Sequence, residues 1–112
     1  MQMVLKNSNV IVAHVDLDLR YTWVQSSEPD FDSDAILGKR DDELDDSDGA
    51  RELFAMKRHV IETGESGRVR INHPLAEDEI HRDVTVEPLR NDRGKVIGAT
   101  SIAVEVSGVG EK

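Results

Sequence analysis

The last third of the chain carries the pattern that most restricts the fold. Two runs, Glu79–Arg90 and Lys95–Ser107, alternate charged or small side chains with β-branched ones at the period of a strand. Between them, Asn91–Gly94 is made of residues that favour turns. This pattern predicts a β-hairpin with one apolar face. Because such a face must be covered in a stable domain, the rest of the chain has to supply a helical layer.

The preceding part of the chain predicts three further strands. These segments are Val10–Val15, Arg20–Val24 and Gly67–Asn72. The first is a compact apolar run, the second is aromatic and β-branched, and the third alternates apolar residues with arginine. Only the turn residues Asp16–Asp18 and Leu19 separate the first two, so they are close enough in sequence to pair as a hairpin.

One predicted helix, Ser47–Thr63, is long enough to cover a sheet, and Gly64 ends it. Its core-facing stripe consists of apolar residues at helical spacing: Ala50, Leu53, Phe54, Val60 and Ile61. Lys57 interrupts the stripe, and we expect its aliphatic stem to lie along the core with its ammonium in water. Short helical turns are predicted at Ser33–Leu37 and Asp41–Leu44.

The order of these elements predicts an α+β fold. Five antiparallel strands form one sheet, and short helices and one longer helix pack on one face of it. If the first hairpin lies beside the last strand, the strand order is 2-1-5-4-3. Helices over a curved sheet of this kind enclose a small, mostly apolar cavity, and such places are where small molecules preferentially bind.

Composition excludes several classes of function. The 112 residues make one domain with a formal net charge of −9, which repels a phosphate backbone and an anionic membrane surface. We therefore predict no nucleic-acid partner. No apolar run reaches membrane length, so we also predict no membrane insertion. The absence of cysteine excludes disulfides and thiol chemistry, and it fits a cytoplasmic protein.

The acidic residues are concentrated just before the predicted long helix. Six carboxylates lie within eight positions: Asp41, Asp42, Glu43, Asp45, Asp46 and Asp48. A calcium loop would need alternating ligands and a central glycine, and Leu44 lies in the middle of this run. We expect a solvated segment whose carboxylates favour the helix N-terminus through its dipole.

Several fragments of the chain, taken in order and with their spacing, carry a resemblance to a known family. They are Asp16–Val24, Ile36–Lys39, Asp41–Leu44, Val60–Glu65 and Val84–Gly98. Together they resemble PAS domains, most of all those that precede bacterial sensor histidine kinases. The match covers residues 8 to 107. The resemblance implies an N-terminal lead-in at 1–9, a PAS sensor domain at 10–107 and the start of a linker or tail at 108–112.

The resemblance implies a sensory input module of a signal-transduction protein in a two-component system. Such a domain binds a small ligand or a partner, often as a homodimer, and biases an effector elsewhere in the parent chain. The residues show no catalytic constellation, so the domain itself is predicted not to be an enzyme.

Two alternatives to a sensory module stay open. One is a dimerisation or protein-interaction module without a ligand. The other is a ketosteroid-isomerase-like enzyme, whose fold normally opens with a long helix that Met1–Asn9 cannot supply.

The family pattern also suggests which residues line a ligand pocket. The candidates are Tyr21, Trp23, Ile36, Leu53, Met56, Val69, Ile71, Val84, Val86 and Ile102. We expect Tyr21 and Trp23 to share an inward strand face, either as pocket walls or simply as core. PAS domains often end in Asp-Ile-Thr, and Glu105, Val106 and Ser107 stand at the matching positions, where they would relay a signal. An ordinary strand end is the alternative.

No cofactor is identified by the sequence. A haem-binding PAS domain carries its iron ligand early in the long helix, near Leu53, whereas His59 falls about two turns later. A covalent flavin adduct needs a cysteine, so both cofactors are disfavoured. Possible ligands for a divalent ion gather near one turn: His73, His81, Asp78 and Glu79. Surface histidines near turns are far commoner than metal sites, and we predict no metal.

Overall fold

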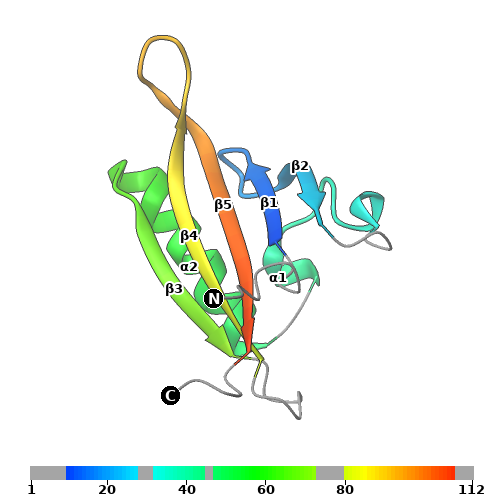
Figure 1. Cartoon of the computed structure of the whole chain (residues 1–112). Coiled ribbons are helices and arrows are strands. Elements are labelled where there is room, and N and C mark those ends of the chain that lie inside the picture. The colour runs from blue at the N-terminus through cyan, green and yellow to red at the C-terminus, as the bar shows by residue number, and fades with distance from the viewer. Residues whose placement is uncertain (1–9, 28–31, 45–46, 73–79, 108–112) are drawn as a thin grey trace, which may run out of the picture.

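The computed structural model of the chain describes residues 10–27, 32–44, 47–72 and 80–107. Its elements are β1 (Val10–Val15), β2 (Tyr21–Ser26), the 3₁₀ turn η2 (Ser33–Ala35), α1 (Asp41–Leu44), α2 (Asp48–Thr63), β3 (Gly67–Asn72), β4 (Ile80–Arg90) and β5 (Val96–Ser107). Figure 1 shows their arrangement. The segments 1–9 and 108–112 lie outside the described residues, so the predicted domain bounds stay predictions.

The strands form one sheet in the order β2-β1-β5-β4-β3, and every neighbouring pair is antiparallel. The predicted α+β fold and strand order are therefore confirmed. The last strand, β5, is central, since it pairs with both β1 and β4. The long helix α2 contacts β3, β4 and β5 as well as α1, and in Figure 1 it lies behind these strands.

Both ends of α2 follow the chemistry expected from the sequence. The Ser47 side chain accepts a hydrogen bond from the Ala50 backbone N–H at 3.2 Å, which satisfies one of the free donors of the first turn. Gly64 takes a left-handed conformation, with φ 76°, and its N–H donates to the Val60 carbonyl at 2.8 Å. The predicted helix of 47–63 is thus α2, capped by the residues that the sequence indicates.

The turns also lie where the sequence places them. Asn91 and Lys95 close the β4–β5 hairpin by a backbone hydrogen bond of 2.9 Å, and Gly94 supplies a positive φ of 80°. The predicted helical turn at Ser33–Leu37 is shorter than expected, because it is a 3₁₀ turn that ends at Ala35. A 3₁₀ turn satisfies few backbone groups, and such turns rarely extend further.

The core lies between α2 and the face of the sheet that α2 covers. Its buried apolar residues are Val15, Leu19, Val60, Val84, Val86 and Ala99. Along each strand these residues alternate with side chains on the opposite, outer face, as the period of a strand requires. The 16-residue helix α2 covers this face through its contacts with β3, β4 and β5.

A bulge changes the alternation in β2. His14 pairs with Trp23 and the next residue of β1, Val15, pairs with Tyr21, so Thr22 has no partner on β1. An extra residue in one strand shifts every later side chain to the opposite face. Tyr21 therefore lies on the helical side of the sheet, and Trp23 lies on the outer face.

Candidate functional site

Three polar side chains from three different elements meet beneath the helical layer. Tyr21 comes from β2, Asp41 begins α1, and Lys57 lies in the middle of α2. The Lys57 ammonium donates to Asp41 Oδ2 at 2.9 Å and to the Tyr21 hydroxyl at 2.6 Å. The Tyr21 hydroxyl in turn donates to Asp41 Oδ1 at 2.5 Å. We call these three residues the polar cluster.

Two members of the polar cluster are removed from water, and the third, Tyr21, is half-buried. Lys57 has no exposed surface, and Asp41 is 6% exposed. The ammonium also lies 4.2 Å from the centre of the Tyr21 ring, a distance at which a cation is attracted to the ring face. A buried ion pair is tolerable only where each charge is paired and hydrogen-bonded, and the closed set of three contacts meets that condition.

The electrostatics of the polar cluster follow from its burial. Desolvation lowers the pKa of Lys57, and the negative charge and hydrogen bond of Asp41 partly oppose that shift. Burial, then the charge of Asp41, then the hydrogen bond to it raise the pKa of the Tyr21 phenol far above its ordinary value of 10.0. The phenol therefore keeps its proton, and donates its hydrogen bond, at pH values at which an ordinary tyrosine has lost it.

This geometry predicts how the chain responds to alkaline pH. Because the pKa of Tyr21 is higher in the folded than in the unfolded chain, the phenol stabilises the fold fully below pH 10.0, and that contribution is lost as the pH rises further. The lysine opposes this slope around pH 10.5, because burial lowers the pKa of its amine and the unfolded chain there holds the proton more tightly; the opposition fades as the pH rises well above 10.5. We expect tyrosinate absorbance to appear only as the domain unfolds.

The measurement is unambiguous because the chain has one tyrosine. Ultraviolet absorbance of tyrosinate and far-ultraviolet circular dichroism are followed together from pH 8 to pH 12, a range that brackets the ordinary value of 10.0. In urea the phenol should titrate near its ordinary value. A tyrosinate signal that rises near pH 10.0 with the circular dichroism unchanged would contradict the placement of the Tyr21 hydroxyl against Asp41.

The placement of Lys57 and Asp41 corrects two expectations. Lys57 does not extend its ammonium into water, because Asp41 and Tyr21 supply partners inside the domain. Asp41 likewise does not belong to the solvated acidic segment, whereas its neighbours Asp42 and Glu43 are exposed. In the sequence, a lysine on an apolar helical stripe is the one feature that points to a buried charge at this position. Nothing in the sequence indicates which of the six nearby carboxylates pairs with that lysine.

The prediction that Tyr21 and Trp23 share an inward face is wrong, and the bulge at Thr22 is the physical reason. The Trp23 side chain is on the outer face, where it is 42% exposed. Its ring lies 4.9 Å from the ring of His14, its cross-strand neighbour. Trp23 therefore does not line a pocket beneath the helices.

Ile102 is also on the outer face. In the register of β5 it pairs with Val12 and Thr85, whereas the neighbours Ser101 and Ala103 face the helices. Its side chain is 37% exposed. The expectation that it lines an inward pocket is wrong, because successive side chains of β5 point to opposite faces of the sheet and that of Ile102 points outward.

The other pocket candidates divide into core and periphery. Val84 and Val86 are fully buried in the core, and four candidates pack against that core while staying partly exposed: Leu53, Met56, Val69 and Ile71. Ile36 follows η2 and is half-buried. The structure thus gathers Tyr21 and these six core and flanking residues on the helical side of the sheet. Whether they bind a ligand stays a prediction.

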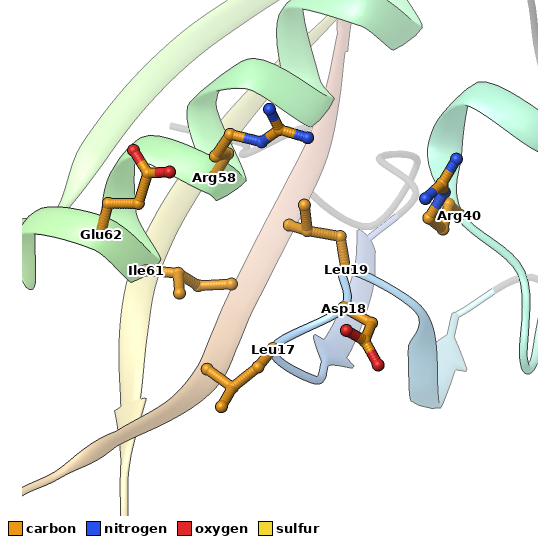
Figure 2. Close-up of a pocket in the computed structure, with 7 residues that line it drawn as sticks. All are labelled: Leu17, Asp18, Leu19, Arg40, Arg58, Ile61 and Glu62. Atoms are coloured by element: carbon orange, nitrogen blue, oxygen red, sulfur yellow. The ribbon is translucent and has the colours of Figure 1, made fainter.

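A pocket that the sequence did not indicate opens between the β1–β2 turn and α2 (Figure 2). Its volume is about 290 Å³. The lining residues are Leu17, Asp18, Leu19, Arg40, Arg58, Ile61 and Glu62. They come from three segments far apart in the sequence, and this is why no local motif marks the site.

The two histidines whose side chains are described, His14 and His59, lie on different elements. His14 stacks on Trp23 at the outer face, and His59 is exposed on α2. His73, Asp78 and Glu79 lie outside the described residues. Within the described part of the chain, no group of three histidine or carboxylate side chains is placed to hold a metal ion. In the same part, no helix is long and apolar enough to cross a membrane.

The relay residues end the central strand. Glu105 pairs in register with Arg82 of β4, and the backbone of β5 continues to Ser107. The side chains of Val106 and Ser107 are not among those described. The relay role of the three residues stays a prediction.

The sequence matches the family described as the PAS fold over residues 5–109. The chain belongs to the PAS family. The order of strands and helices described above is therefore the family's order, and the resemblance inferred from the sequence is confirmed.

This PAS domain is similar in sequence to plant histidine kinases. It is 30% identical over 111 residues to Histidine kinase 5 of Arabidopsis thaliana and 27% identical over 110 residues to Probable histidine kinase 1 of Oryza sativa subsp. indica. Each match covers 96% of this chain but only 12% and 11% of the relative. The PAS domain thus spans about an eighth of the curated relatives that it matches. Bacterial origin stays a prediction.

Solved structures share the fold. A sensory box sensor histidine kinase from Vibrio cholerae superimposes with a TM-score of 0.68 at 18% identity, over 87% of this PAS domain and 81% of that chain. The structure described as VqmA bound to DPO gives a TM-score of 0.69 at 23% identity, over 86% of this PAS domain and 52% of that chain.

Proposed function

We propose that this PAS domain is the cytoplasmic sensory input of a signalling protein whose effector is a histidine kinase. The observation that carries the proposal is the 30% identity to Histidine kinase 5 of Arabidopsis thaliana over 111 residues, since this match spans nearly all of the PAS domain. In this role the domain has no catalytic activity of its own. A bound small molecule or partner shifts its conformational equilibrium, and the effector responds to that shift.

The arrangement of β5 supports a route for the signal. β5 lies between β1 and β4, and α2 packs against it, so a change in how the helices lie on the sheet alters contacts along this strand. We propose that Glu105, Val106 and Ser107, at the end of β5, pass the change to the attached effector.

A chimeric kinase tests the proposal. The segment of Histidine kinase 5 that matches this chain is replaced by residues 1–112, and autophosphorylation is measured. We expect the chimera to keep kinase activity and Glu105→Ala, a variant at the proposed relay, to change its rate by at least about threefold while the domain stays folded. Equal rates for the wild-type domain, for Glu105→Ala and for a chimera with the domain deleted would contradict a sensory role.

We also propose that a ligand of this sensory function binds on the helical side of the sheet, near Tyr21 and the half-buried residues Leu53, Met56, Val69 and Ile71. The support is that these half-buried, mostly apolar side chains lie around one buried core, the kind of surroundings in which small-molecule sites form. VqmA, which shares the fold, has been solved bound to DPO.

A second role, homodimerisation, is favoured by the outer face of the sheet. Trp23 and Ile102 are 42% and 37% exposed there. Val12 is the cross-strand partner of Ile102, so its side chain points to the same face. Exposed apolar side chains that cluster on one face are typical of interaction surfaces. We propose that two copies of the domain pair through this face.

Light scattering after size-exclusion chromatography checks the pairing. We expect the wild-type chain to be a dimer and Ile102→Asp to be a monomer, because a charge would be buried at the interface without a partner. Ile97→Asp is the matched control, since Ile97 is on the same strand and 40% exposed. A wild-type monomer, or loss of the dimer in both variants, would contradict the proposed interface.

A further inference from the structure

The pocket between the β1–β2 turn and α2 has an apolar floor that cannot collapse. Figure 2 shows Ile61 of α2 pointing toward Leu17 and Leu19 of the turn. Leu19 is held at φ 69°, a conformation that leucine rarely adopts, and the Asp16 side chain fixes the turn by accepting from the Asp18 and Arg20 backbone N–H groups. The floor is therefore preformed.

Part of this floor stays in contact with water. Leu17 is 52% exposed, although it lines the pocket beside the buried Leu19. Removing apolar surface of this kind from water is favourable. Binding of an apolar group of a ligand against Leu17 would therefore be favourable.

Two arginines supply positive charge at the pocket. The guanidinium groups of Arg40 and Arg58 lie 5.6 and 5.1 Å from the centre of the Phe54 ring. Arg40 is held by two hydrogen bonds to Asp42, both of 3.1 Å. Arg58 forms no ion pair with any described residue, so its planar set of donors is free to bind a carboxylate in bidentate geometry.

Two carboxylates supply negative charge at the same pocket. Asp18 and Glu62 are exposed and line it, and neither is ion-paired within the described part of the chain. Glu62 follows Arg58 by one helical turn, so their Cβ atoms are about 5–6 Å apart. One ligand that carries both signs of charge on neighbouring atoms can therefore reach both residues.

We propose that this pocket binds a free α-amino acid with an apolar side chain, such as leucine. Its carboxylate pairs with Arg58, its ammonium pairs with Glu62, and its side chain covers Leu17, Leu19 and Ile61. A polyanion is disfavoured by the carboxylates of the pocket and by the net charge of −9. A wholly apolar ligand would bury the charged groups without partners. This pocket is separate from the ligand site proposed near Tyr21, and the amino acid is a second ligand; the proposal rests on the proposed sensory function only for the consequence of binding.

Nuclear magnetic resonance tests the proposal with L-leucine as the probe. We expect leucine to shift the backbone amide signals of Leu17–Leu19 and Arg58–Glu62, with a dissociation constant on the order of 1 mM or below. L-leucinamide lacks the carboxylate and N-acetyl-L-leucine lacks the ammonium. Each should bind at least about tenfold more weakly, because one charged pair is lost.

Variants on the exposed surface of α2 complete the test. Arg58→Gln and Glu62→Gln should each weaken leucine binding by about tenfold, whereas Glu52→Gln, exposed on the N-terminal half of the same helix, should leave it unchanged. Absence of leucine-induced shifts in these segments, equal binding of N-acetyl-L-leucine, or unchanged affinity in Arg58→Gln would overturn the proposal. Since the chimeric kinase is assayed without leucine, failure of binding is distinguishable from failure of the sensory role.

Discussion

Replacing Lys57 with methionine is expected to lower the free energy of unfolding by about 3–5 kcal/mol. The substitution keeps an unbranched apolar side chain as far as Cε but removes the ammonium, so the carboxylate of Asp41 stays buried without its cation. A small domain is stable by only about 5–15 kcal/mol, so this loss is a large fraction of its stability.

Urea denaturation followed by circular dichroism measures the effect, and Lys39→Met is the matched control. Lys39 is exposed, and its substitution should change the free energy of unfolding by less than about 0.5 kcal/mol. If Lys57→Met is no less stable than the control, the ammonium lies in water and the polar cluster does not exist as described.

The second large effect is expected for Gly98→Ala in β5. A Cβ atom at Gly98 would lie 2.0 Å from the Val15 carbonyl oxygen and 3.4 Å from Asp16 Cα, both of them backbone atoms of the neighbouring segment. Backbone atoms that are fixed by a ladder cannot move aside as a side chain can, so β1 must separate from β5 near its end. We expect a loss of about 3 kcal/mol, at the upper end of the usual cost of overpacking.

Gly67→Ala is the control for this prediction. A Cβ atom at Gly67 would approach Met56 Sδ, at the far end of a flexible side chain that can adopt another rotamer. The loss of stability should therefore stay below about 1 kcal/mol. Equal melting temperatures for Gly98→Ala and the wild-type chain would show that β1 and β5 are further apart than described.

Local chemistry was enough to predict most of the fold. The β4–β5 hairpin follows from alternation around Asn91–Gly94, and α2 follows from an apolar stripe between Ser47 and Gly64. These signals are contained within short windows of sequence. The strand order needs long-range pairing, which no local pattern contains, so it was predicted only on the condition that the first hairpin lies beside the last strand.

The candidate site was less predictable because its contacts join distant residues. A single unpartnered residue in β2, Thr22, moves Trp23 to the outer face, and alternation alone gives no sign of it. Lys57 and Asp41 lie 16 positions apart, and no pattern distinguishes Asp41 from the exposed carboxylates that follow it. The pocket of Figure 2 likewise depends on three segments brought together only by folding.

The ionic contact between Lys57 and Asp41 joins α1 and α2 within the candidate site, and a double-mutant cycle tests it most directly. The free energy of unfolding is measured for the wild-type chain, Lys57→Met, Asp41→Asn and the double variant. A coupling energy of about 2–3 kcal/mol is expected for two buried groups in direct contact. A coupling energy within about 0.5 kcal/mol of zero would contradict the contact, and with it the polar cluster from which the site is built.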